Sequence, residues 1–481
     1  MKCLFVASEC YPFIKTGGLA DVAGALPAAL ARQGCDVQTL LPGYPAVLQK
    51  LRRRRKVTDF ADLFGDAATL TRAKGASGLT YLILEAPKLF DRPGNPYLGP
   101  NGKDWPDNAK RFAAFSWVAA EIALGRCGRW APDIVHLHDW QAALTAAYLE
   151  FAEAPRPRTV CTIHNLAFQG VFPSRLLRPL DLPRTAFVHD GLEYFGDISF
   201  LKAGLVYSDT VTTVSPTYAR EIQTEKGGMG LGGVLRSRAK SVHGILNGVD
   251  ETVWNPETDP LIAANYSRRS AKNKARNKRA LQDRFGLEKK RNALLFAVVS
   301  RLTEQKGLDL LVPSLAHLVW RGGQIAMLGS GEPGLEDAFA DATRQYSGKI
   351  GVEIGYDEPL SHLMQAGADA ILVPSRFEPC GLTQLYGLRY GTLPIVARVG
   401  GLADTVIDAN EAALKDGVAT GFQFAPVTAD AFRFALDRAF DVFENRQQWN
   451  AMRRRAMAQN VGWRDPAAAY IQLYQSLLSA D

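Results

Sequence analysis

The chain has 481 residues, of which 47% are hydrophobic and 22% charged, and its formal net charge is +7. This composition excludes a disordered chain, and the length leaves room for two large domains or about three small ones. The mild positive charge does not indicate nucleic-acid binding, although it suits a small anionic ligand. Because no apolar run approaches the roughly 18 residues of a membrane span and no signal peptide is evident, we expect a cytoplasmic protein with no membrane or nucleic-acid partner.

Short apolar runs alternate with longer amphipathic segments up to about residue 245. The segments with helical periodicity include 20–34 and 109–124. Runs that resemble strands buried on both faces lie at 3–7, 36–42, 81–85, 133–137, 158–163 and 209–214. The alternation predicts a parallel sheet covered by helices. The basic run 51–56 is interpreted as a solvated loop or helix end, with a polysaccharide contact as the alternative.

The alternation breaks at 250–290, where the polar, basic stretch 267–286 is interpreted as a connection and a solvated helix. A helix is predicted at 308–320, and the chain from about 428 onward has a helical pattern. Further predicted strands lie at 292–300, 324–331, 349–355, 369–375 and 393–398. The second half therefore predicts another doubly wound α/β domain. The six cysteines show no paired or metal-type spacing and are interpreted as small buried side chains.

Polar residues follow the predicted strands, where loops of a doubly wound sheet hold ligands. "KTGGLADV" places Lys15 and the Gly17–Gly18 pair before a helix, which suits phosphate, although a tight turn explains it equally well. A near copy, "RVGGLADTV", returns at 398–406. The pair suggests two similar lobes that each offer a glycine loop to a shared ligand, and chance is the alternative.

Two further strand ends in the first half carry candidate sugar contacts. Asp139 beside Trp140 suits a sugar, because hydroxyls bond the carboxylate and the apolar sugar face stacks on the indole. The alternative is that Asp139 caps a helix and Trp140 lies in the core. His164 follows the next strand and either positions a hydroxyl or caps a loop.

In the second half, Arg301 and Lys306 flank a predicted helix start, which suits a diphosphate; two surface cations are the alternative. Glu378 precedes Cys380 in "FEPCGL" and could bond sugar hydroxyls, whereas Cys380 is interpreted as a turn or packing residue. The seven histidines show no metal-ligand spacing, so we expect protein cations rather than a metal to neutralise the diphosphate.

Six ordered motifs carry a family resemblance: "KTGGLADV", "HLHDWQ", "TIHNLAFQG", "ILNGVD", "SRLTEQKG" and "PSRFEPCGLTQLYGLRYG". They resemble the glycogen and starch synthase family of retaining glycosyltransferases. The resemblance implies the GT-B fold, an α/β architecture of two Rossmann-like doubly wound domains that face a deep cleft. The first would comprise 1–245 with a C-terminal helix at 460–481, and the second 246–459. It further implies ADP-glucose as donor, the non-reducing end of an α-1,4-glucan as acceptor, and no metal or other cofactor.

The resemblance also implies roles for individual residues. Those implied in catalysis are Glu378, Lys306, Arg301, His164 and Lys15. Those implied in donor binding are Lys15, Gly17, Gly18, Asp21, Asn247, Tyr356, Cys380, Gly381, Leu382 and Thr383. Those implied on the acceptor or sugar side are Tyr97, Asp139 and Trp140. The E-x7-E spacing of many retaining GT-B enzymes is absent, since Tyr386 stands eight residues after Glu378. This puts in doubt any mechanism that needs a second glutamate.

Three rival functions were weighed against this one. An NAD-dependent oxidoreductase should show G-x-G-x-x-G after a strand, which "KTGGL" does not match. A non-catalytic glucan-binding protein would not need the two cations, and a phosphorylase would need a pyridoxal-phosphate lysine. The residues do not decide between adenine and uracil donors, nor do they give an oligomeric state.

Overall fold

The computed structural model describes residues 1–479, so the last two residues of the predicted helix 460–481 lie outside the described residues. The chain divides into two compact units. Unit 1 comprises Met1–Gly248 with Trp463–Asp481, and unit 2 comprises Val249–Gly462. Each unit has its own hydrophobic core.

Unit 1 is built on a nine-stranded sheet in the order β12-β11-β7-β6-β1-β2-β5-β4-β3. The strands that run parallel to at least one neighbour are β1 (Lys2–Val6), β2 (Asp36–Pro42), β5 (Thr80–Glu85), β6 (Ile134–His138), β7 (Arg158–Ile163), β11 (Thr210–Thr213) and β12 (Val242–Gly244). Six of these coincide with the predicted strands, so the parallel sheet is confirmed. The short strands β8 (Val171–Phe172), β9 (Glu193–Tyr194) and β10 (Asp197–Ser199) form a separate sheet.

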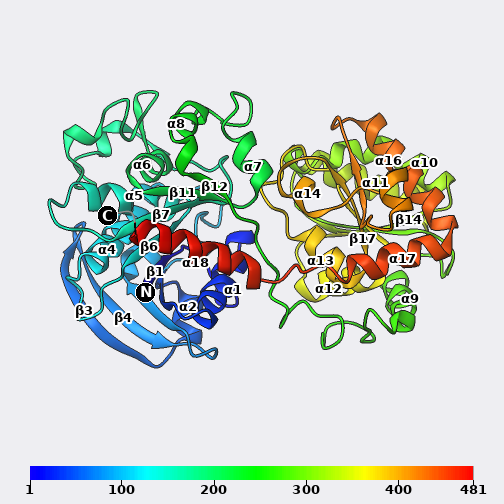
Figure 1. Ribbon diagram of the computed structural model, residues 1–481, viewed down its shortest axis with the longest axis horizontal. Helices are drawn as coiled ribbons and strands as arrows, with labels where there is room; N and C mark the ends of the chain where they lie inside the picture. The colour runs from blue at the N-terminus through cyan, green and yellow to red at the C-terminus, as the bar shows by residue number, and fades with distance from the viewer. Residues whose placement is uncertain (480–481) are drawn as a thin grey trace. The chain divides into compact units, whose positions relative to one another are not determined.

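Helices cover the sheet of unit 1. They are α1 (Gly18–Arg32), α2 (Pro45–Lys50), α3 (Pro87–Phe90), α4 (Asn108–Ala123), α5 (Trp140–Glu150), α6 (Phe200–Tyr207), α7 (Pro216–Glu221), α8 (Gly232–Ser237) and α18 (Arg464–Leu478). Helix α5 packs with both α4 and α6, whereas α18, red in Figure 1, packs beside α1. The last helix of the chain therefore completes the first unit.

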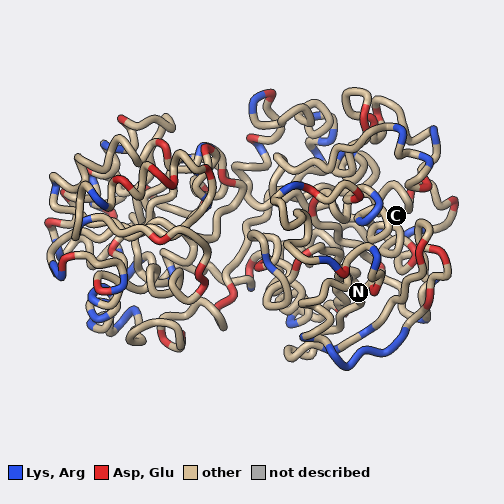
Figure 2. The backbone as a smooth tube through the Cα atoms, turned by 180° about the vertical axis from the view of Figure 1, so that it is seen from behind, with Lys and Arg blue, Asp and Glu red and all other residues tan. Residues whose placement is uncertain are grey.

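The interpretation of the basic run 51–56 as a loop or helix end is right for residues 51–53, which follow α2 without regular structure, and wrong for residues 54–56. The second half of the run begins β3 (Arg54–Leu63), which pairs antiparallel with β4 (Asp66–Lys74), and β4 pairs antiparallel with β5. Residues 52–56 form the long blue stretch at the edge of the sheet in Figure 2. Charged side chains on an edge strand discourage pairing with another chain, which explains a strand without an apolar pattern.

Unit 2 contains a six-stranded, entirely parallel sheet in the order β15-β14-β13-β16-β17-β18. Its strands are β13 (Leu295–Val299), β14 (Gln324–Gly329), β15 (Ile350–Ile354), β16 (Ala370–Val373), β17 (Leu393–Ala397) and β18 (Phe422–Phe424). Its helices are α9 (Lys274–Arg284), α10 (Leu315–Trp320), α11 (Pro333–Gln345), α12 (Glu358–Gly367), α13 (Thr383–Tyr390), α14 (Gly400–Thr405), α15 (Glu411–Lys415), α16 (Ala429–Glu444) and α17 (Arg446–Ala456). Each of the five predicted strands is present.

Two predicted helices differ from the structure. The segment 308–320 begins as two 3₁₀ turns, Leu308–Leu310 and Val312–Ser314, and becomes α-helical only at Leu315. Pro313 explains the delay, because proline inside an α-helix removes a hydrogen bond and clashes with the preceding turn.

The basic helix α9 is not simply solvated, because Lys274 and Lys278 are buried. The Lys274 ammonium donates to Thr392 Oγ1 at 2.7 Å, and that of Lys278 to Asp369 Oδ2 at 2.6 Å. These bonds attach α9 to the sheet of unit 2.

Tyr474 of α18 should anchor this helix to the sheet of unit 1. Its hydroxyl lies 2.7 Å from His136 Nδ1 on β6, and both side chains are fully buried. We expect Tyr474→Phe to lower the free energy of unfolding by about 1–3 kcal/mol, because the imidazole nitrogen is left without its partner. Urea unfolding measures this, with the exposed Ser476→Ala on the same helix as control. Equal stability of both variants and the wild type would contradict the anchoring role.

Candidate functional site

The strand order of unit 2 contains one reversal point. From β13 the chain proceeds outward to β14 and β15, whereas β16, on the other side of β13, leads to β17 and β18. In such sheets ligands bind beyond the carboxyl ends of the strands at this reversal. The two loops at this point are 300–307, after β13, and 374–382, after β16.

Lys306 and Glu378 join these two loops across the reversal point. Lys306 Nζ lies 2.6 Å from Glu378 Oε2, and the side chains are 18% and 9% exposed. The Ser375 hydroxyl donates to the same carboxylate oxygen at 2.8 Å. A mostly buried cation and a buried carboxylate therefore face each other where the fold class binds its ligands.

The helix start predicted beside Lys306 is not present. Lys306 ends a 3₁₀ turn, Glu304–Lys306, and Gly307 follows with a φ of 66°. A side chain at Gly307 would place its Cβ 2.0 Å from the Pro374 carbonyl oxygen. Glycine is thus needed to bring the two loops together rather than to open an α-helix, and the charge of Lys306 is the main electrostatic feature here.

Arg376 is a positioning residue that sequence reasoning missed. Its guanidinium makes a bidentate pair with Asp309, with both N···O distances 2.6 Å, and donates to the Glu304 carbonyl oxygen at 2.8 Å. The Asp309 carboxylate raises the pKa of Arg376, and Arg376 lowers the pKa of Asp309. Arg376 thereby locks the loop of Glu378 onto the loop of Lys306. The sequence signal that could have identified Arg376 is its position inside the "PSRFEPCG" motif.

The second glycine pair, Gly400–Gly401, has a different role from the one predicted. A Cβ at Gly400 would lie 2.0 Å from the Glu378 carbonyl oxygen, and one at Gly401 would lie 2.3 Å from that of Cys380. The Gly401 N–H donates to the Glu378 carbonyl oxygen at 3.1 Å. This pair is therefore buried against the Glu378 loop instead of being presented to a ligand.

The segment from Cys380 to Thr383 forms the turn before α13. Cys380 is buried, whereas Gly381, Leu382 and Thr383 are half-buried. Gln384 stabilises the turn, since its Nε2 donates to the carbonyl oxygens of Cys380 and Gly381 at 2.9 and 2.8 Å. Packing thus accounts for Cys380 as the sequence suggested.

Arg301 and Tyr356 are the exposed predicted residues of unit 2. Arg301 follows β13 and forms no ion pair with any residue in the described part of the chain. Tyr356 follows β15 and is 69% exposed, with its hydroxyl bonded to Glu358. Between them lies the loop after β14, where Gly329 and Gly331 allow close contact with the backbone of 300–302.

Unit 1 has its reversal point between β1 and β6, and Glu9 lies at the end of β1. Sequence reasoning missed this carboxylate, although an acid directly after a buried strand was visible. Glu9 is 3% exposed. It accepts hydrogen bonds from the Thr16 N–H at 2.5 Å, the Thr16 hydroxyl at 2.6 Å and the Tyr97 hydroxyl at 2.5 Å. Glu9 thus fixes both the glycine loop and Tyr97.

The first glycine loop is open, unlike the second. Gly17 and Gly18 are exposed, and a Cβ at Gly17 would meet nothing within 4 Å. The Gly17 N–H points to Glu9 at 3.3 Å, and Lys15 Nζ lies 2.9 Å from Asp21 Oδ1. The Gly17 N–H, which the sequence analysis assigned to phosphate, is therefore already directed to the Glu9 carboxylate. Lys15 is half-buried beside the loop.

Histidines from two adjacent strands form a buried column in unit 1. His138 Nδ1 on β6 lies 2.9 Å from His164 Nε2, just after β7, and His136 Nε2 lies 2.6 Å from Thr162 Oγ1. Burial lowers the pKa of both His136 and His164 to about 3, so the imidazoles are neutral at physiological pH. Through its ring contact, His138 orients the His164 ring, which is neutral and half-buried.

Trp140 lies in the core, as the alternative predicted, whereas Asp139 stands at the N-cap of α5 without a side-chain capping bond and instead holds the chain after β7. Asp139 Oδ1 accepts the His164 backbone N–H at 2.7 Å, and burial raises the pKa of Asp139 to about 7. Trp140 is 9% exposed and packs against Phe112 with ring centroids 4.9 Å apart. A Cβ at Gly170 would lie 2.5 Å from Trp140 Cε3, so the chain passes directly over the indole. Little of this ring remains for stacking on a sugar.

Asn247 lies in unit 1, one residue before its boundary. The side chain is 9% exposed, and its Oδ1 is buried with no hydrogen-bond partner among residues 1–479. An amide oxygen in this state is suited to accept a hydrogen bond from a ligand.

Among the described residues, no group of three or more His, Cys, Asp or Glu side chains is arranged to hold a metal ion. Likewise, within residues 1–479 no helix combines the length and apolar character required to cross a bilayer. All six cysteines are buried and none forms a disulfide, as their sequence contexts predicted.

Comparison with protein families identifies the class that this fold and these loops define. The model of the starch synthase catalytic domain matches residues 2–237, and that of glycosyl transferases group 1 matches residues 280–456. The chain is a glycosyltransferase of the GT-B fold.

Similar proteins narrow the class further. The chain is 56% identical to glycogen synthase of Roseobacter denitrificans over 478 residues, covering 99% of this chain and all of that protein. It is also 56% identical to glycogen synthase of Rhodopseudomonas palustris over 480 residues, covering 100% of this chain and 98% of that protein. The chain belongs to the glycogen synthase family, which confirms the resemblance drawn from the motifs.

Solved structures agree with this assignment. The catalytic domain of starch synthase IV from Arabidopsis thaliana, bound to ADP and acarbose, matches with a TM-score of 0.91 and 32% identity, covering 99% of both chains. Sucrose-phosphate synthase from Thermosynechococcus elongatus matches with a TM-score of 0.59 at 17% identity, which supports the fold alone.

The neutral histidine column should make unit 1 sensitive to acid. In the unfolded chain His136 binds a proton near its usual pKa of 6.5, whereas in the folded protein it does so only near 3. Its contribution to stability is therefore present above pH 6.5 and is lost as the pH falls toward 3. We expect the stability advantage of the wild type over His136→Gln to shrink by up to about 1.4 kcal/mol per pH unit below 6.5.

Urea unfolding of both proteins at several pH values between about 4 and 8 measures this difference. The raised pKa of Asp139 acts in the opposite direction, since it favours folding on acidification, but it is common to both proteins and cancels in the comparison. A difference that is independent of pH would show that His136 does not stay neutral.

Proposed function

We propose that this chain transfers glucose from ADP-glucose to the non-reducing end of an α-1,4-glucan, with retention of anomeric configuration and release of ADP. The observation that carries the proposal is the Lys306–Glu378 pair at the reversal point of unit 2, 2.6 Å apart. Support for the substrates comes from the relatives named glycogen synthase and from the starch synthase structure bound to ADP.

Unit 2 is proposed to bind the nucleotide diphosphate. Lys306 and the unpaired, exposed Arg301 supply positive charge for the two phosphates, so no metal ion is required. The exposed ring of Tyr356 is available to stack on the adenine. The strand order β15-β14-β13-β16 sets out Tyr356, the glycine loop, Lys306 and Glu378 in that sequence along one edge. This order matches base, phosphates and sugar in a nucleotide sugar.

Glu378 and the turn after it are proposed to receive the glucose. The Glu378 carboxylate has a second oxygen beyond the one bonded to Lys306 and Ser375, and it can accept sugar hydroxyls. The half-buried segment Gly381, Leu382 and Thr383 offers backbone N–H groups beside it. Cys380 is proposed to act only by shaping this turn.

Unit 1 is proposed to contribute contacts to the sugar and to the acceptor. Lys15 and the open Gly17–Gly18 loop provide a cation and accessible backbone, with Asp21 holding Lys15. The neutral His164 ring presents a nitrogen for a glucose hydroxyl, because its Nε2 is engaged by His138. Tyr97 and Asn247 complete the set, and Asp139 acts by holding His164 rather than by touching sugar.

A same-face mechanism is proposed for retention. Departure of ADP places negative charge on its terminal phosphate, and Lys306 with Arg301 stabilises that charge where it develops. The leaving phosphate then accepts the proton of the glucan hydroxyl that attacks from the same side. Glu378 is committed to Lys306 and Ser375, and the eighth position after it is Tyr386, so a double displacement through a second glutamate is not proposed.

The function is tested by incubating the purified chain with labelled ADP-glucose and glycogen. We expect label in the glycogen, release of one ADP per glucose, less transfer from UDP-glucose, and the same rate in EDTA, because protein cations neutralise the diphosphate. A rate that collapses in EDTA would contradict the metal-free part of the proposal. Absence of transfer from either donor would contradict the activity itself.

Lys306→Ala should lower kcat by about a hundredfold or more, because it removes charge stabilisation from the leaving diphosphate. Lys349→Ala is the matched control, since Lys349 pairs with Glu288 away from the reversal point. Loss of Lys306 also leaves the Glu378 carboxylate unpaired, so thermal unfolding must confirm that the variant is folded. A folded Lys306→Ala enzyme with near-normal kcat would remove the assigned role.

A further inference from the structure

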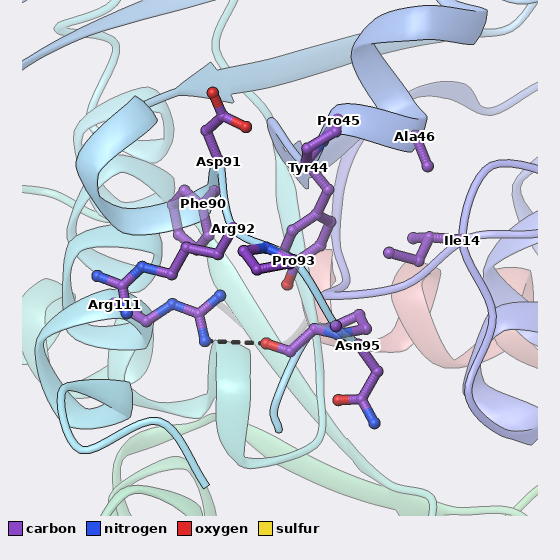
Figure 3. A pocket seen from close by; sticks show the side chains of 12 residues that line it. Ile14, Tyr44, Pro45, Ala46, Phe90, Asp91, Arg92, Pro93, Asn95 and Arg111 are labelled. Carbon is purple, nitrogen blue, oxygen red and sulfur yellow. Dashed lines mark hydrogen bonds between the residues drawn. The ribbon is translucent and has the colours of Figure 1, made fainter. Parts of the chain in front are cut away.

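A pocket with a volume of about 310 Å³ lies in unit 1, beside the loop that carries Lys15 and Gly17. Its walls come from four places in the chain: Ile14 before the first glycine loop, the start of α2 at Tyr44, the segment Phe90–Pro96, and Arg111 of α4 (Figure 3). The lining ends at Pro96, one residue before Tyr97. None of the proposed donor residues lines this pocket.

Arg111 places a buried positive charge in the pocket wall. The side chain is only 1% exposed. Its Nε donates to the Leu89 carbonyl oxygen at 2.7 Å, and its Nη1 donates to the Pro96 carbonyl oxygen at 2.9 Å and to Asn108 Oδ1 at 2.7 Å. All three acceptors are uncharged, and the hydrogen bonds of Arg111 to the described residues come from Nε and Nη1, not from Nη2. Two N–H groups of a guanidinium thus remain available.

The carboxylates near Arg111 are committed elsewhere. Asp107 makes a bidentate pair with Arg92, with both distances 2.6 Å. Glu9 accepts the hydroxyls of Thr16 and Tyr97. Asp91 lies at the rim, and its carboxylate points away from Arg111 in Figure 3. Asp107 attracts Arg111 without bonding to it. A buried charge with no directly bonded counter-charge is costly, so its retention here calls for an explanation.

Tyr44 supplies a second unsatisfied polar group to the same space. Its side chain is 3% exposed, and its hydroxyl has no hydrogen-bond partner within residues 1–479. In Figure 3 this hydroxyl points toward the Arg111 guanidinium. Burial raises the pKa of Tyr44, so the hydroxyl stays a protonated donor at any physiological pH. Two donors from different elements therefore converge, and both need an acceptor.

We propose that this pocket is a binding site for a small oxyanion, the carboxylate or phosphate group of a compact metabolite, held between Arg111 Nη2 and the Tyr44 hydroxyl. An oxyanion supplies both a directly bonded counter-charge for Arg111 and the acceptor that Tyr44 lacks. Phe90 and Pro93 line the pocket beside these donors and offer apolar contact for the rest of such a molecule. The site is independent of the donor site proposed in unit 2.

Calorimetric titration of the full chain tests the proposal, with inorganic phosphate and acetate as separate probes at constant ionic strength. Saturating ADP is present so that Lys306 and Arg301 do not contribute. We expect the wild type to bind at least one probe, and Tyr44→Phe to bind it roughly tenfold more weakly, because one hydrogen bond to a charged group is lost. Arg111→Gln should abolish binding.

Tyr148→Phe is the matched control, since it removes another buried hydroxyl of unit 1, bonded to the Leu180 carbonyl oxygen at 2.6 Å. We expect it to bind the probes like the wild type. If only phosphate or only acetate binds, the site is supported, and the probe that binds shows whether the natural ligand carries a phosphate or a carboxylate group. If Arg111→Gln does not fold, Tyr44→Phe decides alone, because the phenyl ring keeps its contact with Phe90.

Two results would overturn the proposal. One is that neither probe binds the wild type. The other is that binding is unchanged in Tyr44→Phe, which would place the anion elsewhere. Failure here leaves the glucosyltransferase assay unaffected, since that assay depends on Lys306 and not on this pocket, so the two proposals can fail separately.

Discussion

The buried ion pair between Lys306 and Glu378 is the interaction on which the arrangement of the loops after β13 and β16 depends. Each partner belongs to a different half of the sheet, because β13 and β16 are neighbours that lead in opposite directions. Removing either charge would leave the other buried and unpaired, which typically costs about 3–5 kcal/mol. The pair therefore keeps a cation and a carboxylate in a fixed geometry before any substrate arrives, and this preorganisation is what charge stabilisation in catalysis requires.

Glycines near this pair allow the backbones of neighbouring loops to pack closely around it. Gly307 lies against the Pro374 carbonyl oxygen, and Gly400 lies against that of Glu378, where any Cβ would clash. Arg376 adds a bidentate pair with Asp309 between the same loops. Unit 1 is arranged differently. The Glu9 carboxylate accepts hydrogen bonds from the hydroxyls of Thr16 and Tyr97. The loop at Gly17 stays open. The two similar glycine motifs thus serve two different purposes.

Much of the fold could be predicted from the sequence, because buried parallel strands are continuous apolar runs. The edge strand β3 was missed since its exposed, basic residues have no apolar pattern, and β12 and β18 are too short to show one. Lys306 and Glu378 were predicted from their positions after strands. The sequence could not decide whether Trp140 is buried or faces a sugar, because Gly170 and Phe172, which cover it, lie thirty residues or more further along the chain. Glu9 and Arg376 act through contacts that only the fold creates.

The most direct test of this account is a crystal structure of the chain with ADP bound. We predict that the terminal phosphate of ADP lies within hydrogen-bond distance of Lys306 Nζ, with the Arg301 guanidinium turned toward the same phosphates and the adenine on the Tyr356 ring. A diphosphate bound away from both Lys306 and Arg301 would contradict the claim that the reversal point of unit 2 is where the leaving group is held.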